Sequence, residues 1–128
     1  MIALNKMDGA IVWKAPSTNE LAGYCSPILI KYQGRRMIAT LTAKALIGVD
    51  ADTGALLWHV RHESYADENV MSPIFHEGHL FISTLFAGSV LWQVNIEKDK
   101  VSLETVWRNL EMDNHHGGVI LWNSNLSC

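Results

Sequence analysis

The chain alternates short apolar runs with clusters of turn-forming residues, and no long window shows the 3.6-residue apolar period of a helix. Four such runs follow one another in residues 24–62. Turn signals separate them, including Gln33-Gly34 after the first run and Asp52-Thr53-Gly54 after the third. The runs are Cys25–Ile30, Met37–Leu41, Ala45–Val49 and Leu56–Val60. This pattern predicts one antiparallel sheet of four strands.

The same pattern returns in residues 70–108. The segment 71–75 (MSPIF) repeats the segment 25–29 (CSPIL) at a spacing of 46 residues. Glu77-Gly78 takes the position of Gln33-Gly34, and Trp107 closes the fourth strand 49 residues after Trp58. The turn around Glu97–Lys100 is expected to be longer than its counterpart in the first unit. We therefore expect a second four-stranded sheet.

Both ends of the chain carry parts of the same unit. Leu4–Trp13 aligns without gaps with Val49–Trp58, 45 residues later, so that Gly9 matches Gly54. Residues 1–14 therefore read as the last two strands of a unit. Residues 116–123 read as the start of another, with its first strand from Gly118 to Trp122. Within a single domain of residues 1–128, the chain holds two complete units and a partial one at each end.

A period of 45 to 49 residues with four strands in each repeat is typical of a β-propeller, in which every repeat is one blade. The fold class predicted for this chain is therefore all-β, a β-propeller fragment of four-stranded antiparallel blades. A blade is a twisted sheet with two apolar faces, so it must stack on neighbouring blades. A large flat side chain at a fixed blade position fills the wedge between two such sheets.

The residues Asp50-Ala51-Asp52-Thr53-Gly54 followed by Trp58 resemble the tryptophan-docking motif of the quinoprotein dehydrogenase-like (PQQ-type) propellers. The match is good at this copy, partial at Asp8-Gly9 with Trp13, and reduced to the tryptophan alone in the third copy. In that family the tryptophan packs between adjacent blades, and the Thr-Gly turn belongs to the same contact. The resemblance implies an inter-blade structural role for one set of residues: Trp13, Trp58, Trp107, Gly9, Thr53 and Gly54. Trp92 and Trp122 fall outside the motif register, and we favour packing roles for them.

Closed propellers usually carry about 4 to 8 blades, and this chain supplies too few. Incomplete sheets leave unpaired strand edges that invite pairing with another chain. The C-terminal first strand and the N-terminal third and fourth strands are complementary, so we expect a homodimer of about six blades with shared blades at its ends. The ragged ends also fit a fragment of a longer propeller protein. Relatives of the resembled family are typically exported, to the bacterial periplasm or outside the cell, whereas residues 1–6 lack the features of a signal peptide.

The composition limits the classes of partner that this chain is expected to bind. The formal net charge is −3 and the pI is near 6.0, which gives no broad basic surface for nucleic acid. No apolar run approaches the roughly 18 residues that would span a bilayer, so we expect no membrane insertion. Cys25 and Cys128 have no metal-ligand spacing, and we interpret them as free thiols. A protein partner is compatible with this composition.

Six histidines invite a metal interpretation, which the spacing does not favour. His59 and His62, like His76 and His79, are three residues apart, and on a strand such residues face opposite sides unless a bulge or turn intervenes. Solvated turn histidines are the interpretation we favour, and no metal ligands are predicted. The loops that precede the first strands are the place where a ligand site is expected if one exists. They comprise Asn114, His115 and His116 as the candidate ligand loop, together with 24–26 and 70–72. For these residues too, hydrogen bonding at the start of a strand is the favoured role.

Two function classes follow, together with the possibility of a remnant that has no function of its own. The favoured one is a non-catalytic propeller module that binds other proteins or acts as a scaffold, with no cofactor and no catalytic residues. The alternative is part of a PQQ-dependent alcohol or sugar dehydrogenase-like quinoprotein. The resemblance implies that such an enzyme would hold PQQ with Ca²⁺, a catalytic Asp and often a disulfide of neighbouring cysteines. The chain has no adjacent cysteines, and no carboxylate pair has acid/base spacing.

Overall fold

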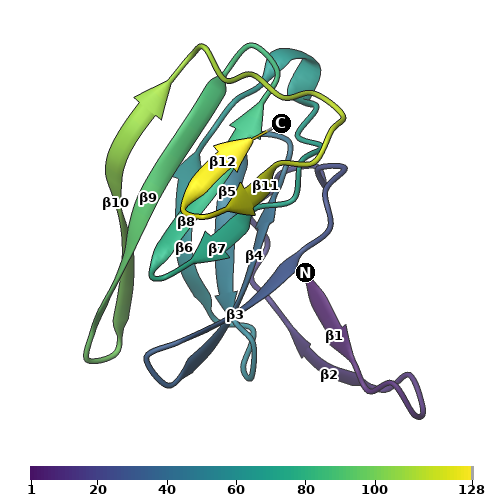
Figure 1. The fold of residues 1–128 in the computed structure, drawn as a ribbon. Coiled ribbons are helices and arrows are strands. Elements are labelled where there is room, and N and C mark those ends of the chain that lie inside the picture. Colours follow the sequence, from purple (N-terminus) through teal and green to yellow (C-terminus); the bar gives the residue numbers. More distant parts are fainter. Residues whose placement is uncertain (128) are drawn as a thin grey trace.

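The computed structural model describes residues 1–127 and consists almost entirely of antiparallel β-strands (Figure 1). Short turns connect the strands within each sheet, and longer loops connect one sheet to the next; one of these loops contains the short 3₁₀ helix η1 (Tyr65–Asp67). Their bounds are β1 (Ile2–Leu4), β2 (Ile11–Lys14), β3 (Ile28–Tyr32), β4 (Arg35–Leu41), β5 (Ala45–Asp50), β6 (Leu56–Arg61), β7 (Ile74–His76), β8 (His79–Thr84), β9 (Gly88–Glu97), β10 (Lys100–Asn109), β11 (Ile120–Trp122) and β12 (Asn125–Ser127).

The strands form two four-stranded sheets and two separate hairpins. The order is β3-β4-β5-β6 in the first sheet and β7-β8-β9-β10 in the second, and all neighbours are antiparallel. The pairs β1-β2 and β11-β12 make the two hairpins. The predicted fold class, an all-β propeller fragment of four-stranded antiparallel units with partial units at both ends, is confirmed.

The turn between the first and second strands has the same backbone geometry in three places. Both residues have positive φ at Gln33-Gly34 (47° and 77°), Glu77-Gly78 (45° and 81°) and Asn123-Ser124 (46° and 62°). This is the geometry of two-residue type I′ hairpins, whose twist matches that of the flanking strands. The third hairpin corrects the prediction for the C-terminus. The sequence indicated a first strand from Gly118 only, whereas β11 begins at Ile120 and a second strand, β12, follows.

The turn between the third and fourth strands also repeats. In β1-β2 the N–H of Gly9 donates to the carbonyl of Asn5 at 2.8 Å, and in β5-β6 the N–H of Gly54 donates to that of Asp50 at 2.9 Å. The Asn5 and Asp50 side chains each accept the N–H two residues on, at 2.9 and 3.0 Å. Gly9 and Gly54 have φ of 74° and 75°, which explains the glycine at both positions. The gapless alignment of these segments therefore reflects two turns with the same hydrogen bonds.

The second sheet differs in this turn. The sequence predicted a longer connection around Glu97–Lys100, but Glu97 pairs directly with Lys100 and only Lys98-Asp99 remain in the turn. The strands β9 and β10 are instead ten residues long each. The charged residues that suggested a loop lie at the exposed tip of this extended hairpin (Figure 1).

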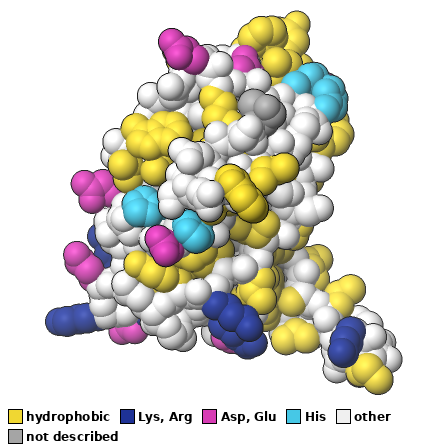
Figure 2. Space-filling model, viewed as in Figure 1, with side chains coloured by type: hydrophobic (Ala, Val, Ile, Leu, Met, Phe, Trp, Pro, Cys, Tyr) yellow, Lys and Arg dark blue, Asp and Glu magenta, His cyan; other side chains and the backbone are white. Residues whose placement is uncertain are grey.

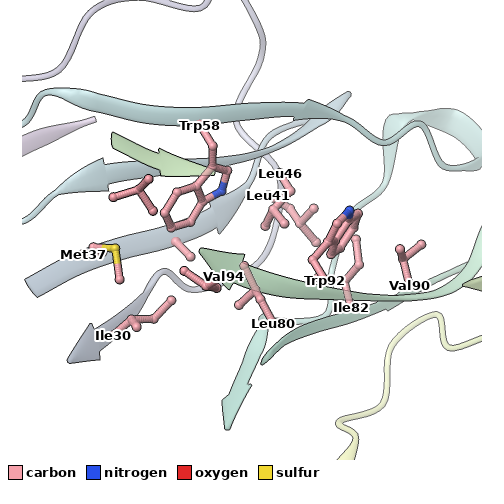
Figure 3. Packing of buried hydrophobic residues seen from close by; sticks show 12 residues of the cluster. Ile30, Met37, Leu41, Leu46, Trp58, Leu80, Ile82, Val90, Trp92 and Val94 are labelled. Carbon is pink, nitrogen blue, oxygen red and sulfur yellow. The ribbon is translucent and has the colours of Figure 1, made fainter. Parts of the chain in front are cut away.

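The core lies between the two four-stranded sheets, where β6 packs near β10 (Figure 3). Trp92 is buried, as expected for a packing role, whereas Trp122 is 72% exposed. Both sheets contribute aliphatic side chains that are almost completely buried. The largest are Ile30, Met37, Leu41 and Leu46 from the first sheet, and Leu80, Ile82, Val90 and Val94 from the second. Removal of this apolar surface from water is the main force that stacks the sheets.

Candidate functional site

The loops that precede β7 and β11 lie at one end of the molecule together with the β8-β9 turn (Figure 1). We call this surface the loop face and define it as residues 62–69, 85–87 and 110–117. Figure 2 shows apolar, acidic and histidine side chains gathered at this end. It includes the candidate ligand loop of the sequence analysis. The burial and hydrogen bonds of these side chains determine which of them are accessible from solvent.

Two asparagines 45 residues apart anchor the loops of the loop face. Asn69 is fully buried, and its Nδ2 donates to the carbonyls of Thr42 at 2.8 Å and Ala43 at 3.1 Å. The backbone carbonyl of Asn69 accepts a hydrogen bond from the N–H of Tyr24 at 2.9 Å. Asn69 therefore connects the loop before the second sheet to two loops of the first sheet. Buried side-chain amides with such partners stabilise loop geometry. Asn69 is therefore a structural residue.

Asn114 occupies the equivalent position and is also buried, at 7% exposure. Its backbone N–H donates to the Ser83 hydroxyl at 3.1 Å, while the hydroxyls of Ser83 and Ser89 donate to the carbonyl of Met112. Within residues 1–127 its Nδ2 has no hydrogen-bond partner. The side chain points into the protein, so it is poorly placed to hold a ligand from solvent.

The two histidines of the candidate ligand loop are less buried than Asn114. His115 Nε2 lies 3.2 Å from Glu68 Oε2, which links the two long loops of the loop face. His116 is exposed, and the two imidazole centroids are 3.6 Å apart. Of the three predicted residues, one is buried, one pairs with a carboxylate, and one faces solvent. The structure therefore brings the histidines together beside one acidic side chain.

An exposed aromatic pair on the loop face was not found from the sequence. Tyr65 and Phe86 are 64% and 72% exposed, and their rings meet edge to face with centroids 5.4 Å apart. The N–H of Phe86 donates to Asp113 Oδ2 at 2.9 Å, and that of Tyr65 to the carbonyl of Leu85 at 3.4 Å. Phe86 has φ of 58°, a left-handed conformation unusual for an aromatic residue. The rings come from loops 21 residues apart, and no local pattern marks them.

His62 contradicts the prediction of solvated turn histidines. Its side chain is buried at 4% exposure, and its Nε2 lies 2.6 Å from the Thr84 hydroxyl. Burial, with a smaller effect from the positive charge of Arg108, lowers the pKa of His62 to about 4. The residue follows the fourth strand of the first sheet and reaches the second sheet. It is a neutral hydrogen-bonding group of the core at neutral pH.

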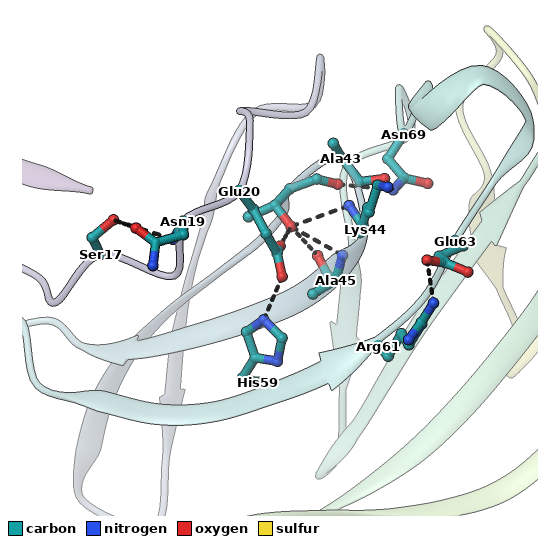
Figure 4. A network of polar contacts seen from close by, with 11 residues as sticks. Ser17, Asn19, Glu20, Ala43, Lys44, Ala45, His59, Arg61, Glu63 and Asn69 are labelled. Carbon is teal, nitrogen blue, oxygen red and sulfur yellow. Dashed lines mark hydrogen bonds and ion pairs between the residues drawn. The ribbon is translucent and has the colours of Figure 1, made fainter.

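The other histidines lie nearer the surface. His59 Nε2 is 2.6 Å from Glu20 Oε1, and the other oxygen of Glu20 accepts a hydrogen bond from the Thr42 hydroxyl (Figure 4). Burial alone would raise the pKa of Glu20, but these hydrogen bonds and the charges of His59 and Lys44 outweigh it and hold that pKa below its usual value. This network attaches the loop before β3 to the first sheet.

His76 and His79 lie on opposite sides of a turn. They are Cα partners in the β7-β8 hairpin, because Glu77-Gly78 forms the two-residue turn between them. His76 Nε2 is 3.7 Å from Glu77 Oε2. Across the described part of the chain, no group of three or more His, Cys, Asp or Glu side chains is arranged to hold a metal ion. Cys25 accepts a hydrogen bond from the Leu41 N–H, and Cys128 lies outside the described residues.

The three tryptophans of the motif occupy one backbone position. Each follows a β-bulge in the last strand of its unit and pairs with a residue of the third strand: Trp13 with Ala3, Trp58 with Gly48, and Trp107 with Leu91. The indole of Trp13 lies on Gly54 of the next sheet, and its Nε1 donates to the Ala51 carbonyl at 3.1 Å. The Thr53 hydroxyl donates to Asp50 Oδ1 at 2.9 Å and braces the same turn.

The second and third tryptophans differ in their surroundings. Trp58 lies over Gly48 in the core between the sheets, and within residues 1–127 its Nε1 has no hydrogen-bond partner. The indole N–H of Trp13 finds its acceptor, the Ala51 carbonyl, in the turn between β5 and β6. The turn between β9 and β10 consists of Lys98-Asp99 alone and offers no equivalent carbonyl to Trp58. Trp107 is 37% exposed and packs against Phe81, with ring centroids 5.9 Å apart. It lines a cavity of 460 Å³ between the second sheet and the β11-β12 hairpin.

Four-stranded antiparallel units that repeat every 45 to 49 residues define a β-propeller repeat protein of the PQQ type. A family model described as "Outer membrane protein assembly factor BamB" matches residues 1–126, and the chain belongs to this family. No curated protein and no solved structure gave a match. The family is typically periplasmic or associated with the outer membrane. Among the described residues, no helix is long and apolar enough to cross a membrane.

Proposed function

We propose that this chain is a non-catalytic scaffold module that completes its propeller by self-association. One observation carries the proposal. The hairpins β1-β2 and β11-β12 stand outside the four-stranded sheets, and within the described residues each has an unpaired strand edge. Exposed strand edges are templates for pairing with another chain. The hairpins also expose large apolar side chains, among them Ile2, Leu4, Ile120 and Trp122. A homodimer with shared blades would cover these edges.

The loop face is the surface that we assign to a second, different protein partner. Tyr65 and Phe86 form an apolar patch that is held in place by backbone hydrogen bonds before any partner arrives. Aromatic side chains that are already ordered lose little entropy on binding. Carboxylates lie in the same loops, among them Glu63, Asp67, Glu68, Glu111 and Asp113. A protein segment with apolar and basic side chains would complement this surface.

The family suggests a cellular setting for this proposal. Its description names an assembly factor of the outer membrane. By analogy, we propose that this chain acts in the bacterial envelope. Binding to other proteins, with no chemical step, is the role that the site's geometry supports, since the buried Asn69 and His62 side chains hold loops and strands together.

Sedimentation of the purified chain at micromolar concentration tests the proposal. We expect a mass of two chains, in exchange with one chain on dilution. A single-chain mass throughout would contradict the self-association. The non-catalytic part has its own test, a titration with PQQ and Ca²⁺. Appearance of the bound cofactor's visible absorbance, with oxidation of an alcohol by an artificial electron acceptor, would contradict that part.

A further inference from the structure

We infer that the loop face binds a basic segment of a partner protein by stacking an arginine side chain on the Tyr65–Phe86 pair, beside the carboxylate of Asp113. The inference rests on the proposed binding of a second protein at this surface, and it names the chemistry of that partner. A difference between the two complete units carries it. The place that a polar contact occupies in the first unit holds two exposed aromatic rings in the second.

In both complete units the loop before the first strand touches the turn region between the second and third strands. In the first unit Glu20 accepts a hydrogen bond from the Thr42 hydroxyl, and the Glu20 side chain is only 16% exposed. In the second unit Tyr65, 45 residues after Glu20, meets Phe86. Each contact lies within one complete unit, so it does not depend on where the chain begins or ends.

Packing does not account for the two rings. A polar contact joins the same two segments in the first unit, whereas both rings in the second unit are mostly in contact with solvent. Phe86 also has a left-handed backbone, as do Ala66 and Asp67 next to Tyr65, with φ of 55° and 60°. Backbone strain of this kind is concentrated at functional sites. The exposed rings are therefore best explained by a partner that covers them.

The charge of the loop face indicates what kind of partner this is. Five of the 13 acidic residues in the sequence lie on the loop face and none of the 10 basic ones does, so the remaining residues carry eight acidic and ten basic side chains. The negative charge of the chain is thus concentrated at the end that presents the aromatic pair (Figure 2). A surface of this kind attracts a positively charged segment and repels an acidic one.

The carboxylate next to the rings is available to such a segment. Asp113 Oδ2 accepts the N–H of Phe86 at 2.9 Å, which holds a negative charge beside the exposed ring. Among residues 1–127 neither Asp113 nor Glu111 forms an ion pair, and Asp113 Oδ1 accepts no hydrogen bond. The other three carboxylates already have basic partners: Asp67 with Lys44 at 3.8 Å, Glu63 with Arg61 at 2.7 Å, and Glu68 with His115 at 3.2 Å.

Arginine fits this arrangement better than lysine. The planes of Tyr65 and Phe86 are nearly perpendicular, at 87°, so their contact covers neither face of the ring that contributes its edge. A planar guanidinium stacks on such a face and can still donate to a carboxylate at its rim. The ammonium group of lysine is more strongly hydrated and does not stack. An arginine over the aromatic pair would therefore use both the rings and Asp113.

A titration of the ¹⁵N-labelled full chain with three simple peptides, followed by NMR at low salt, tests the inference. The probes are hexaarginine, hexalysine and hexaglutamate. We expect hexaarginine to shift the backbone amide signals of Tyr65, Phe86 and Asp113, with a dissociation constant lower than that of hexalysine by about twofold to fivefold. Hexaglutamate should leave these signals unchanged.

Three variants separate the contributions, and a dispersed amide spectrum shows that each is folded. Asp113→Asn keeps a side-chain oxygen for the Phe86 N–H but removes the charge, so it should weaken both basic peptides. Glu97→Gln is its matched control, because it removes the same charge at the tip of the β9-β10 hairpin, away from the loop face (Figure 1). Phe86→Ala should bring the affinity for hexaarginine close to that for hexalysine.

Each contrary result overturns a defined part of the inference. If hexaglutamate shifts the same signals as strongly, the partner is not basic, although the loop face remains a binding surface. If hexaarginine and hexalysine bind the wild-type chain equally well, or if Glu97→Gln weakens them as much as Asp113→Asn, the arginine site is wrong. If none of the peptides shifts the loop-face signals at millimolar concentration, the assignment of this surface to a protein partner is wrong as well. The self-association is tested separately by sedimentation.

Discussion

The indole of Trp13 occupies the space that the absent side chain of Gly54 leaves open. A Cβ at Gly54 would lie 2.5 Å from Cε3 of the ring, closer than real Cβ contacts allow. The glycine is therefore required twice, for its φ of 75° and for the close approach of the ring. This contact attaches the N-terminal hairpin to the first four-stranded sheet, and it makes the glycine a test of the inter-unit contact.

Gly54→Ala should destabilise the chain more than Gly34→Ala. Both glycines have a left-handed backbone, with φ of 75° and 77°, so both substitutions share a cost of about 1 to 2 kcal/mol. No atom lies within 4 Å of a Cβ built at Gly34, whereas at Gly54 the ring of Trp13 must move. We expect a further loss of about 1 to 3 kcal/mol in the free energy of unfolding, measured by urea denaturation. Equal losses would show that the ring does not rest on Gly54 in solution.

Trp13→Phe and Trp58→Phe should differ although both tryptophans are buried. Trp13 Nε1 has the Ala51 carbonyl as its acceptor, so the phenylalanine loses a hydrogen bond as well as ring volume. Trp58 Nε1 is buried without a protein partner in the described residues, so its loss removes an unpaired polar atom. We expect the free energy of unfolding to fall by about 1 kcal/mol more in Trp13→Phe than in Trp58→Phe. Chemical denaturation of both variants measures this difference, and the reverse order would contradict it.

The repeating parts of the fold could be predicted from the sequence because their determinants are local. The turn after the first strand recurs in three units and the turn after the third strand in two, and these turns need particular residues such as Gly34 and Gly54. Where the turn residues change, the prediction fails. The strand β12 was missed because Asn123-Ser124 forms a type I′ turn without glycine, and the β9-β10 turn was misjudged because charged residues continue the strands.

The candidate site was predicted less well because its residues meet through the packing of separate units. The burial of His62 depends on the second sheet, which covers it, and nothing near position 62 in the sequence indicates that. The pair Tyr65 and Phe86 arises where two loops touch. Asn114 was assigned to the candidate ligand loop, but its spacing of 45 residues from Asn69 was the signal of its buried position.

Asn69→Ala should destabilise the chain much more than Asn114→Ala. Asn69 donates two hydrogen bonds to buried backbone carbonyls, and the alanine would leave those carbonyls without a side-chain donor. We expect a loss of about 2 kcal/mol in the free energy of unfolding. The Nδ2 of Asn114 has no partner within residues 1–127, so its removal should change this free energy by less than about 1 kcal/mol. Thermal or urea unfolding of the two variants is the measurement, and similar losses would refute the assignment of Asn69 as the stronger anchor.

Acidification should destabilise the chain through His62, in a pH range set by its two pKa values. In the unfolded chain the imidazole has a pKa of about 6.5, and in the folded protein burial lowers it to about 4. Between these values the unfolded state binds a proton that the folded state excludes. Stability is therefore fully present above about pH 6.5 and falls as the pH is lowered toward 4. The total loss from this one group is about 3 kcal/mol.

His62→Gln removes the titration while keeping a side chain that can hydrogen-bond to the Thr84 hydroxyl. Urea unfolding at a series of pH values should show a shallower loss of stability between pH 6.5 and 4 for this variant than for the wild-type chain. His76→Gln is the matched control, because it makes the same substitution at a histidine side chain that is about half exposed. Glu20, whose pKa is lowered in the folded protein, contributes to all three chains alike, and mainly below its usual value of 4.5. A His62→Gln variant with the wild-type slope would show that His62 can be protonated without opening the core.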